Sequence, residues 1–147
     1  MTGRAGFVAS GVLETCLYAR NLDETAAFYE RVLGLQRFAG SEGRHVFFRC
    51  GSGVFLLFNP EETRRTGGEV PPHGADGPGH VAFAIQALDL PDWRDHVESL
   101  GVEIEAEVGW PSGGTSLYLR DPAGNSVELT SPIIWSIPEE SDDAGNR

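Results

Sequence analysis

A few acidic and imidazole side chains stand out because they interrupt otherwise apolar segments of the chain. Glu14 opens one such segment, His80 opens another, and Glu128 lies inside a third, Ser126-Val127-Glu128-Leu129-Thr130. Imidazole nitrogens and carboxylate oxygens bind divalent metals, and both groups also transfer protons. Glu14 precedes Leu22-Asp23 by the same interval that separates His80 from Leu88-Asp89. Two of the three therefore stand at equivalent places in two halves of the chain.

The cysteines and His73 give weaker evidence for a reactive site. Cys16 and Cys50 are too few and too far apart for a disulfide framework or a cysteine-type zinc site, so we expect reduced thiols. Nothing basic lies beside Cys16 in the sequence to lower the pKa of its thiol. His73 lies in a Gly- and Pro-rich stretch, where a histidine is usually solvated; as part of a lid it would instead contact a ligand.

Length and composition fit one globular domain of 147 residues, with 40% hydrophobic and 22% charged residues. No apolar run approaches the roughly 18 residues that span a bilayer, and residues 1–10 lack a signal-peptide pattern. We therefore expect a cytoplasmic protein without membrane contact. The net charge of −11 argues against nucleic-acid binding. Part of that charge lies in residues 139–147, where we expect a disordered acidic tail.

The first half of the chain predicts a strand, a helix and two more strands. Residues 13–19 alternate enough for a strand, and residues 22–33 place apolar side chains at helical spacing. Asn21 suits the helix N-cap, with Glu24 completing a capping box, and Gly34 suits the C′ position. Strands over 45–49 and 53–58 follow around a Gly-rich turn.

The second half repeats this order. A strand is predicted over 80–85, then a helix from Asp89 or Leu90 to Gly101 with Pro91 in its first turn. Strands over 102–108, 116–120 and 126–130 follow. Aligning the halves places Leu56 on Glu128 and Pro60 on Pro132. Residues 61–78 between the halves lack periodicity and read as a linker or a lid.

Three motifs carry a resemblance to a known family. Residues 21–35, with Phe28-Tyr29 and Leu33-Gly34, resemble the first-helix signature of the vicinal oxygen chelate superfamily, which includes glyoxalases, bleomycin-resistance proteins and dioxygenases. Residues 79–83 resemble the opening of its second half, and residues 117–129, with Asp121-Pro122-Ala123-Gly124-Asn125, its closing motif. The resemblance implies an α+β fold of two βαβββ modules in a glyoxalase-type open barrel with one pocket. Module one spans about 11–60 and module two 79–132.

The resemblance also implies a metal site. Its ligand positions fall here on Glu14, Leu56, His80 and Glu128, and all but Leu56 can bind a metal. Glu14 stands where the family usually has His or Gln. One imidazole and two carboxylates suit Fe(II), Mn(II), Ni(II) or Zn(II). The alternatives are a His80 bonded to a backbone carbonyl and a Glu128 on the surface of an edge strand.

The implied pocket would be lined by residues from both halves and from the linker. Cys16 and Tyr18 share the strand face of Glu14 and should lie beside it. Leu56 belongs to the same pocket, with His73 over it and Trp110 at its rim.

Three functions remain open. The first is a metal-dependent lyase or isomerase of the glyoxalase type, acting on a small oxygen-rich substrate, with Glu14 or Glu128 as base. The second is an extradiol-type dioxygenase, which needs a second histidine that only His73 would supply. The third is a bleomycin-resistance-like binder that sequesters a ligand without catalysis. In each case we expect a homodimer that binds a small molecule.

Overall fold

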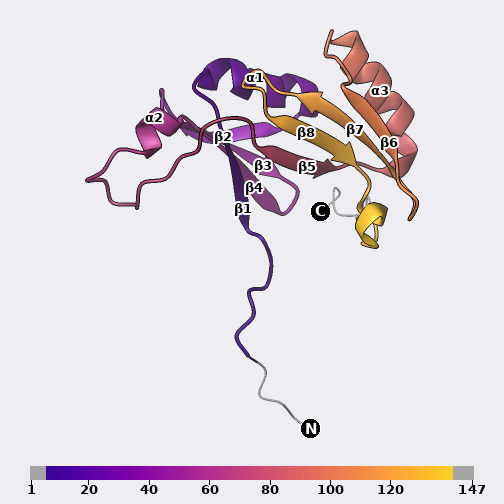
Figure 1. Ribbon diagram of the computed structural model, residues 1–147, viewed down its shortest axis with the longest axis horizontal. Helices are drawn as coiled ribbons and strands as arrows, with labels where there is room; N and C mark the ends of the chain where they lie inside the picture. The colour runs from indigo at the N-terminus through magenta and orange to yellow at the C-terminus, as the bar shows by residue number, and fades with distance from the viewer. Residues whose placement is uncertain (1–5, 141–147) are drawn as a thin grey trace.

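The computed structural model describes residues 6–140, which form two four-stranded sheets with two main helices (Figure 1). None of the described helices is both long and apolar enough to cross a bilayer. In chain order the elements are β1 (Glu14–Tyr18), α1 (Leu22–Leu33), β2 (Gln36–Ser41), β3 (His45–Cys50), β4 (Gly53–Phe58), α2 (Pro60–Thr63), β5 (His80–Ala84), the 3-10 helix η1 (Ala87–Asp89), α3 (Leu90–Ser99), β6 (Ala106–Gly109), β7 (Thr115–Arg120), β8 (Ser126–Thr130) and the 3-10 helix η2 (Pro132–Trp135).

The two sheets have the same topology, as the duplication predicted. Their strand orders are β1-β4-β3-β2 and β5-β8-β7-β6, with a parallel first pair and antiparallel pairs after it. Cys16 pairs with Leu56 in the first sheet, and Ala82 pairs with Glu128 in the second. This register agrees with the sequence alignment of the two halves and places Leu56 and Glu128 at equivalent positions. The α+β, glyoxalase-type fold is confirmed as a pair of curved open sheets, and no closed barrel forms among the described residues.

Both main helices begin and end close to where the sequence predicts. The helix α1 spans Leu22–Leu33, and Gly34 closes it in the left-handed conformation with φ 68°. The capping prediction is wrong in detail, because the Asn21 side chain makes no capping bond to the helix backbone. Its amide instead donates to the carbonyl of Pro122 in module two, 3.0 Å away. A tertiary contact thus takes the place of the local cap.

Three other elements differ from the sequence prediction. Strand β2 was not predicted, because all six of its residues are exposed and give no buried face to recognise. Strand β6 begins at Ala106 instead of Val102, since the Val102 amide still bonds to Val97 at the end of α3. Within the linker, Asn59 caps the short helix α2 by accepting from the Glu61 amide.

The expected acidic tail begins at Glu139. Glu139 accepts from the Ala87 amide, and the Glu140 carbonyl accepts from Gln86. Residues 141–147, to which the disorder prediction also applies, lie outside the described part.

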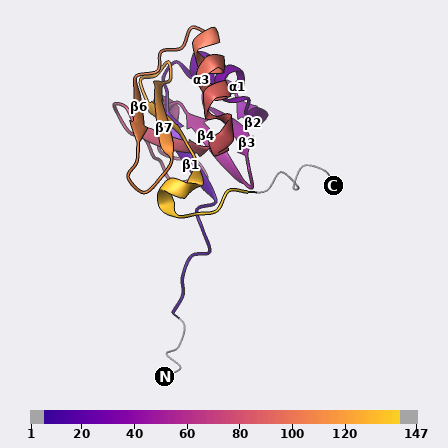
Figure 2. The same cartoon turned by 90° about the vertical axis from the view of Figure 1, so that its right-hand side faces the viewer.

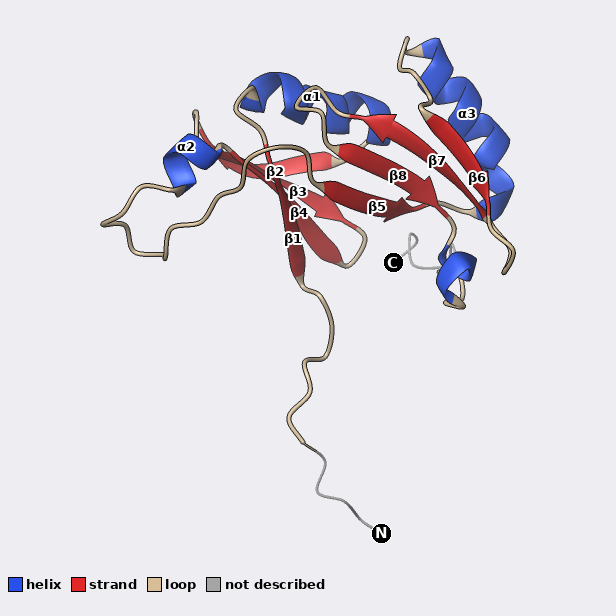
Figure 3. Ribbon diagram, in the orientation of Figure 1, coloured by secondary structure: helices blue, strands red, loops and turns tan. Residues whose placement is uncertain are grey.

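A single apolar core joins the two modules. Tyr29 of α1 packs against Phe55 of β4 and Phe83 of β5, with ring centroids 4.7 and 6.0 Å apart. Figures 2 and 3 show α1 and α3 on the same side of the molecule, each against one sheet. The two main helices therefore cover the core faces and leave the opposite face of each sheet without a covering main helix.

The closing motif holds the modules together at one point. The buried Asp121 carboxylate accepts from the backbone amides of Ala123 and Asn125 and from the Tyr29 hydroxyl at 2.7 Å. Burial and this carboxylate raise the pKa of Tyr29, which stays protonated. Asn125 in turn accepts from the Gly79 amide, just before β5. The turn residues of module two thus fix the start of the strand that carries His80.

Candidate functional site

Glu128 lies on the inner part of its sheet, facing away from the core. Its neighbours Val127 and Leu129 are fully buried against the helices, so strand alternation turns Glu128 to the opposite face. Strand β8 lies between β5 and β7, and the residue is only 6% exposed. The alternative of a surface carboxylate on an edge strand is therefore wrong.

A short chain of hydrogen bonds holds the Glu128 carboxylate. Ser116 on β7 lies with its Oγ 2.5 Å from Glu128 Oε2 and 2.9 Å from Thr130 Oγ1. The indole of Trp110 donates to the same Ser116 oxygen at 2.8 Å. Because the serine hydroxyl has one proton and a carboxylate is the stronger acceptor, Ser116 donates to Glu128. One carboxylate oxygen is thereby fixed and Oε1 is left to face His80.

His80 points toward Glu128 from the neighbouring strand. Its Nδ1 lies 3.1 Å from the backbone carbonyl of Ser126, which can only accept, so Nδ1 carries a proton. Its Nε2 lies 3.3 Å from Glu128 Oε1. In a neutral imidazole of this tautomer, the Nε2 lone pair would face a carboxylate oxygen. A cation shared by the two groups, either a proton or a metal ion, would remove this repulsion.

Tyr118 completes this part of the face. Its ring stacks beside that of His80, with centroids 6.5 Å apart. Burial and the Glu128 charge raise the pKa of Tyr118, so its phenol stays protonated and remains a hydrogen-bond donor.

Glu14 does not join His80 and Glu128 within one chain. It begins β1 as His80 begins β5, and it is exposed to solvent. In residues 6–140 no three His, Cys, Asp or Glu side chains are close enough together to hold a metal. At the position in module one that corresponds to Glu128, the face carries the buried Leu56. One chain therefore supplies two of the three predicted ligands at one place.

The other predicted pocket residues divide between the two modules. Trp110 lies in module two, joined to Glu128 through Ser116. Cys16, Tyr18 and Leu56 lie on the face of module one, where the Tyr18 hydroxyl is 2.6 Å from Nδ1 of His73. His73 also packs edge-on against Phe58. His73 therefore lies against module one and does not reach His80. This placement removes the support for a dioxygenase site with two histidines from one chain.

Ion pairs hold the linker that carries His73. Asp76 accepts from Arg20 at 2.8 Å and from Arg64 at 2.9 Å, and these hydrogen bonds lower the pKa of its carboxyl. The backbone amide of His73 donates to Thr63 at the end of α2. The Asp76–Arg20 ion pair thus ties the linker to module one, and the contacts with Thr63 and Arg64 hold the two ends of the linker together.

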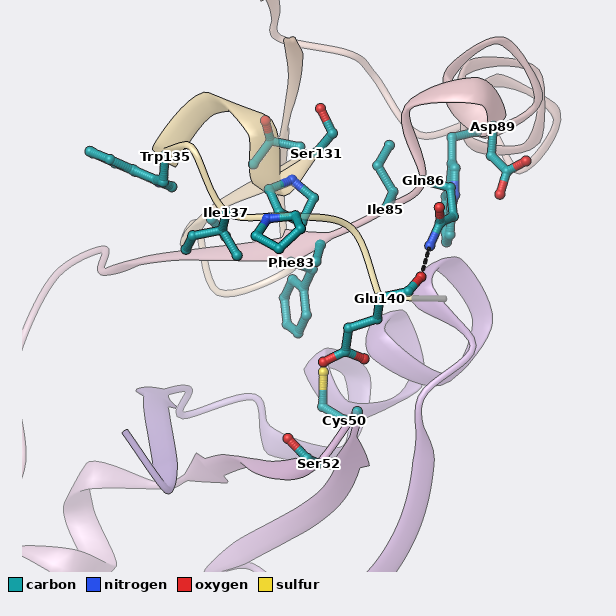
Figure 4. A pocket seen from close by; sticks show the side chains of 17 residues that line it. Cys50, Ser52, Phe83, Ile85, Gln86, Asp89, Ser131, Trp135, Ile137 and Glu140 are labelled. Atoms are coloured by element: carbon teal, nitrogen blue, oxygen red, sulfur yellow. Dashed lines mark hydrogen bonds between the residues drawn. The ribbon is translucent and has the colours of Figure 1, made fainter. Parts of the chain in front are cut away.

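A cavity with a volume of about 700 Å³ lies where the modules meet the C-terminal segment (Figure 4). None of Cys16, Tyr18, Leu56, His73 and Trp110 lines it. It is bounded by the turn after β3, by β5, by the start of α3 and by residues 131–140. Sequence reasoning did not assemble this set because its members come from three distant segments; Trp93 and Trp135 were the signals that the sequence offered for a ligand groove.

The match to a family model agrees with this architecture. Residues 11–129 match the Glyoxalase/Bleomycin resistance protein/Dioxygenase superfamily. The chain belongs to this superfamily, as the sequence motifs indicated.

Its relatives include a lactoylglutathione lyase from Agrobacterium tumefaciens, whose crystal structure has a TM-score of 0.86 and 40% sequence identity, covering 89% of this chain and 100% of that one. The metallothiol transferase FosB of Bacillus licheniformis is 28% identical over 85% of this chain and 77% of its own length. The fosfomycin resistance protein FosX of Listeria innocua is 26% identical, over 82% and 88%. These relatives are named as enzymes or resistance proteins for small molecules.

Proposed function

We propose that this protein is a divalent-metal-dependent lyase or isomerase of the glyoxalase type, acting on a small oxygen-rich substrate. The observation that carries the proposal is the His80–Glu128 pair, whose facing nitrogen and oxygen atoms lie 3.3 Å apart, an arrangement that suits one shared cation. Relatives named as a lyase and as a metallothiol transferase support this class of chemistry.

The surroundings of the pair fit a metal. A histidine ligand usually donates its second ring nitrogen to a carbonyl, as His80 does to Ser126, and a carboxylate ligand is usually held by a further hydrogen bond, as Glu128 is by Ser116. Nitrogen and oxygen donors suit Fe(II), Mn(II), Ni(II) or Zn(II).

A second copy of the chain would supply the third ligand. Glu14 occupies in module one the place of His80 in module two, and it is exposed at the start of an edge strand. Two modules with the same topology can face one another across a twofold axis, so Glu14 of one copy would approach the His80–Glu128 pair of the other. The expected homodimer thus becomes part of the proposed site.

The proposed roles follow from how each group is held. The metal, when bound, would act as a Lewis acid on a substrate oxygen. Glu128 is fixed by Ser116 and His80 and therefore suits a ligand. Glu14 is exposed and has no such restraint, so of the proposed ligands it is also the better candidate for the base that takes a proton from the substrate. Tyr118, protonated beside the pair, is placed to donate a hydrogen bond.

Metal analysis of purified variants tests the proposal. His80→Ala and Glu128→Gln should each lower metal affinity by at least about 10-fold, because each removes a ligand donor or its charge. Glu14→Gln should have a smaller effect, since an amide oxygen still ligates. Glu103→Gln, an exposed carboxylate outside the site, is the matched control.

Circular dichroism should show that all four variants fold. A folded His80→Ala protein with full metal occupancy would contradict the proposal and leave a protonated His80–Glu128 ion pair as the explanation.

One observation favours a second candidate function, a binder without catalysis. The large cavity is lined by Trp93 and Trp135 together with the carboxylates of Asp89 and Glu140. Metal content near one per chain after reconstitution would support the enzyme, and its absence would leave the binder as the function.

A further inference from the structure

All the charged side chains that line the large cavity are acidic. Seventeen residues line it, and among them there is no Lys, Arg or His. Two carboxylates do line it, Asp89 before α3 and Glu140 in the C-terminal segment. Figure 4 shows the Glu140 side chain reaching toward Cys50 on the opposite wall. Burial raises the pKa of the Cys50 thiol, which therefore stays neutral. Among the described residues that line it, the cavity thus offers no cationic side chain to pair with an anion.

The rest of the wall is mainly apolar. Trp93 and Trp135 provide aromatic surface, and Phe83, Ile85 and Ile137 provide the remainder. A volume of about 700 Å³ is ordinary for a small-molecule site, where apolar walls supply affinity and a few polar groups set orientation. The cavity is therefore suited to a bulky apolar body.

The cavity adjoins the face that carries His80 and Glu128. Ala82 lines the cavity and pairs in register with Glu128. Thr130 also lines it and contacts Ser116, the residue that holds the Glu128 carboxylate. A molecule whose reacting end lies at the His80–Glu128 pair can thus extend its other end into the cavity.

We propose that this cavity binds the non-reacting body of the ligand, and that this body is aromatic or alicyclic and uncharged or cationic. The statement that this body is part of a substrate rests on the proposed function. The selection against an anionic tail depends only on the walls of the cavity. A substrate with a carboxylate or phosphonate at its distal end would place that charge near Asp89 and Glu140 without a counter-charge.

Direct binding to metal-free protein tests the inference independently of any catalysis. Three probes share one ring system and differ in charge: 2-naphthylmethanol, 2-naphthylmethylamine and 2-naphthylacetate. Isothermal titration calorimetry at pH 7 should show binding of the alcohol and the amine, with the acetate at least 10-fold weaker. Equal or tighter binding of the acetate, or no binding of the alcohol and the amine at 1 mM, would overturn the inference.

Variants locate the binding and identify the cause of the charge preference. Trp135→Ala should weaken the alcohol and the amine by about 10-fold, because one aromatic wall is lost. Ile133→Ala is the matched control, since Ile133 is exposed on the same short helix and does not line the cavity. The double change Asp89→Asn with Glu140→Gln should bring the acetate to within about 3-fold of the alcohol.

Unchanged affinities in Trp135→Ala would place the probes elsewhere and overturn the proposal. An unchanged charge preference in the double variant would overturn the electrostatic cause. Failure of the metal experiment would leave these binding results intact, so the two proposals can fail separately.

Discussion

The role of the Glu128 carboxylate depends on the position of its strand in the sheet. It is buried on an inner strand, so it needs both a hydrogen-bond donor and a nearby cation. Ser116 provides the donor, and the His80 side provides the place for the cation. The polar residues around Glu128 therefore form a connected set.

We expect Ser116 to affect metal binding through its hydrogen bond to Glu128. Ser116→Ala removes the donor to Glu128 Oε2 and leaves Trp110 without its acceptor, so the carboxylate gains freedom to rotate. We expect metal affinity to fall by about 10-fold, since changes in residues that orient ligands typically cost 10–100-fold. Titration calorimetry with Mn(II) or Zn(II) measures it. Ser41→Ala, exposed on β2, should leave the affinity unchanged; an equal loss in both variants would contradict the assigned role.

At the scale of elements, α1 shows how backbone conformation limits substitution. Gly34 ends the helix with φ 68°, and an added Cβ there would meet nothing within 4 Å. Gly34→Ala therefore tests conformation alone, and we expect it to lower the free energy of unfolding by about 1 kcal/mol. Urea denaturation measures this value. The control is Gly11→Ala, where φ is not positive and space is also open; it should be neutral.

The linker element predicts a pH dependence. The pKa of Asp76 is lowered in the folded state by hydrogen bonds from Arg20 and Arg64. The contribution of a lowered carboxyl pKa is fully present above the unfolded value of about 3.9 and is lost as the pH falls through the folded value. The linker should therefore stay attached at neutral pH and loosen below about pH 4.

Asp76→Asn should reproduce this loosening at pH 7. We expect faster hydrogen exchange for the linker amides, including that of His73, with little change in global stability because the ion pairs are exposed. Glu69→Gln, a linker carboxylate in no ion pair of the described residues, is the control. Equal exchange in wild type and Asp76→Asn would show that other contacts hold the linker.

At the scale of the whole molecule, the proposed site requires two copies. Light scattering after size exclusion should give a mass of twice the 15.9 kDa chain. A mass near that of one chain at micromolar concentration would contradict the expected homodimer. Dimerisation alone, however, does not show that Glu14 acts between chains.

Mixed dimers test whether Glu14 acts between chains. In a heterodimer of Glu14→Ala and His80→Ala chains, one site regains Glu14, His80 and Glu128 if Glu14 comes from the other copy. Metal binding should then return to about half the sites of the wild type. If Glu14 acts within its own chain, neither site is complete and no recovery follows. Each variant alone, as a homodimer, provides the baseline.

The sequence by itself determined the repeated order of a strand, a helix and further strands, although without β2, together with the bounds of α1 and the alignment of Glu14 with His80 and of Leu56 with Glu128. These follow from local periodicity, turn residues and equal spacing, which one-dimensional patterns record. Only the tertiary structure decided that His80 and Glu128 face one another, that Glu14 and His73 belong to the other module's face, and that the cavity lies beside Trp135. Those facts depend on how two sheets are set around a shared core and on where the C-terminal segment packs. Such long-range contacts leave no period or spacing in the chain.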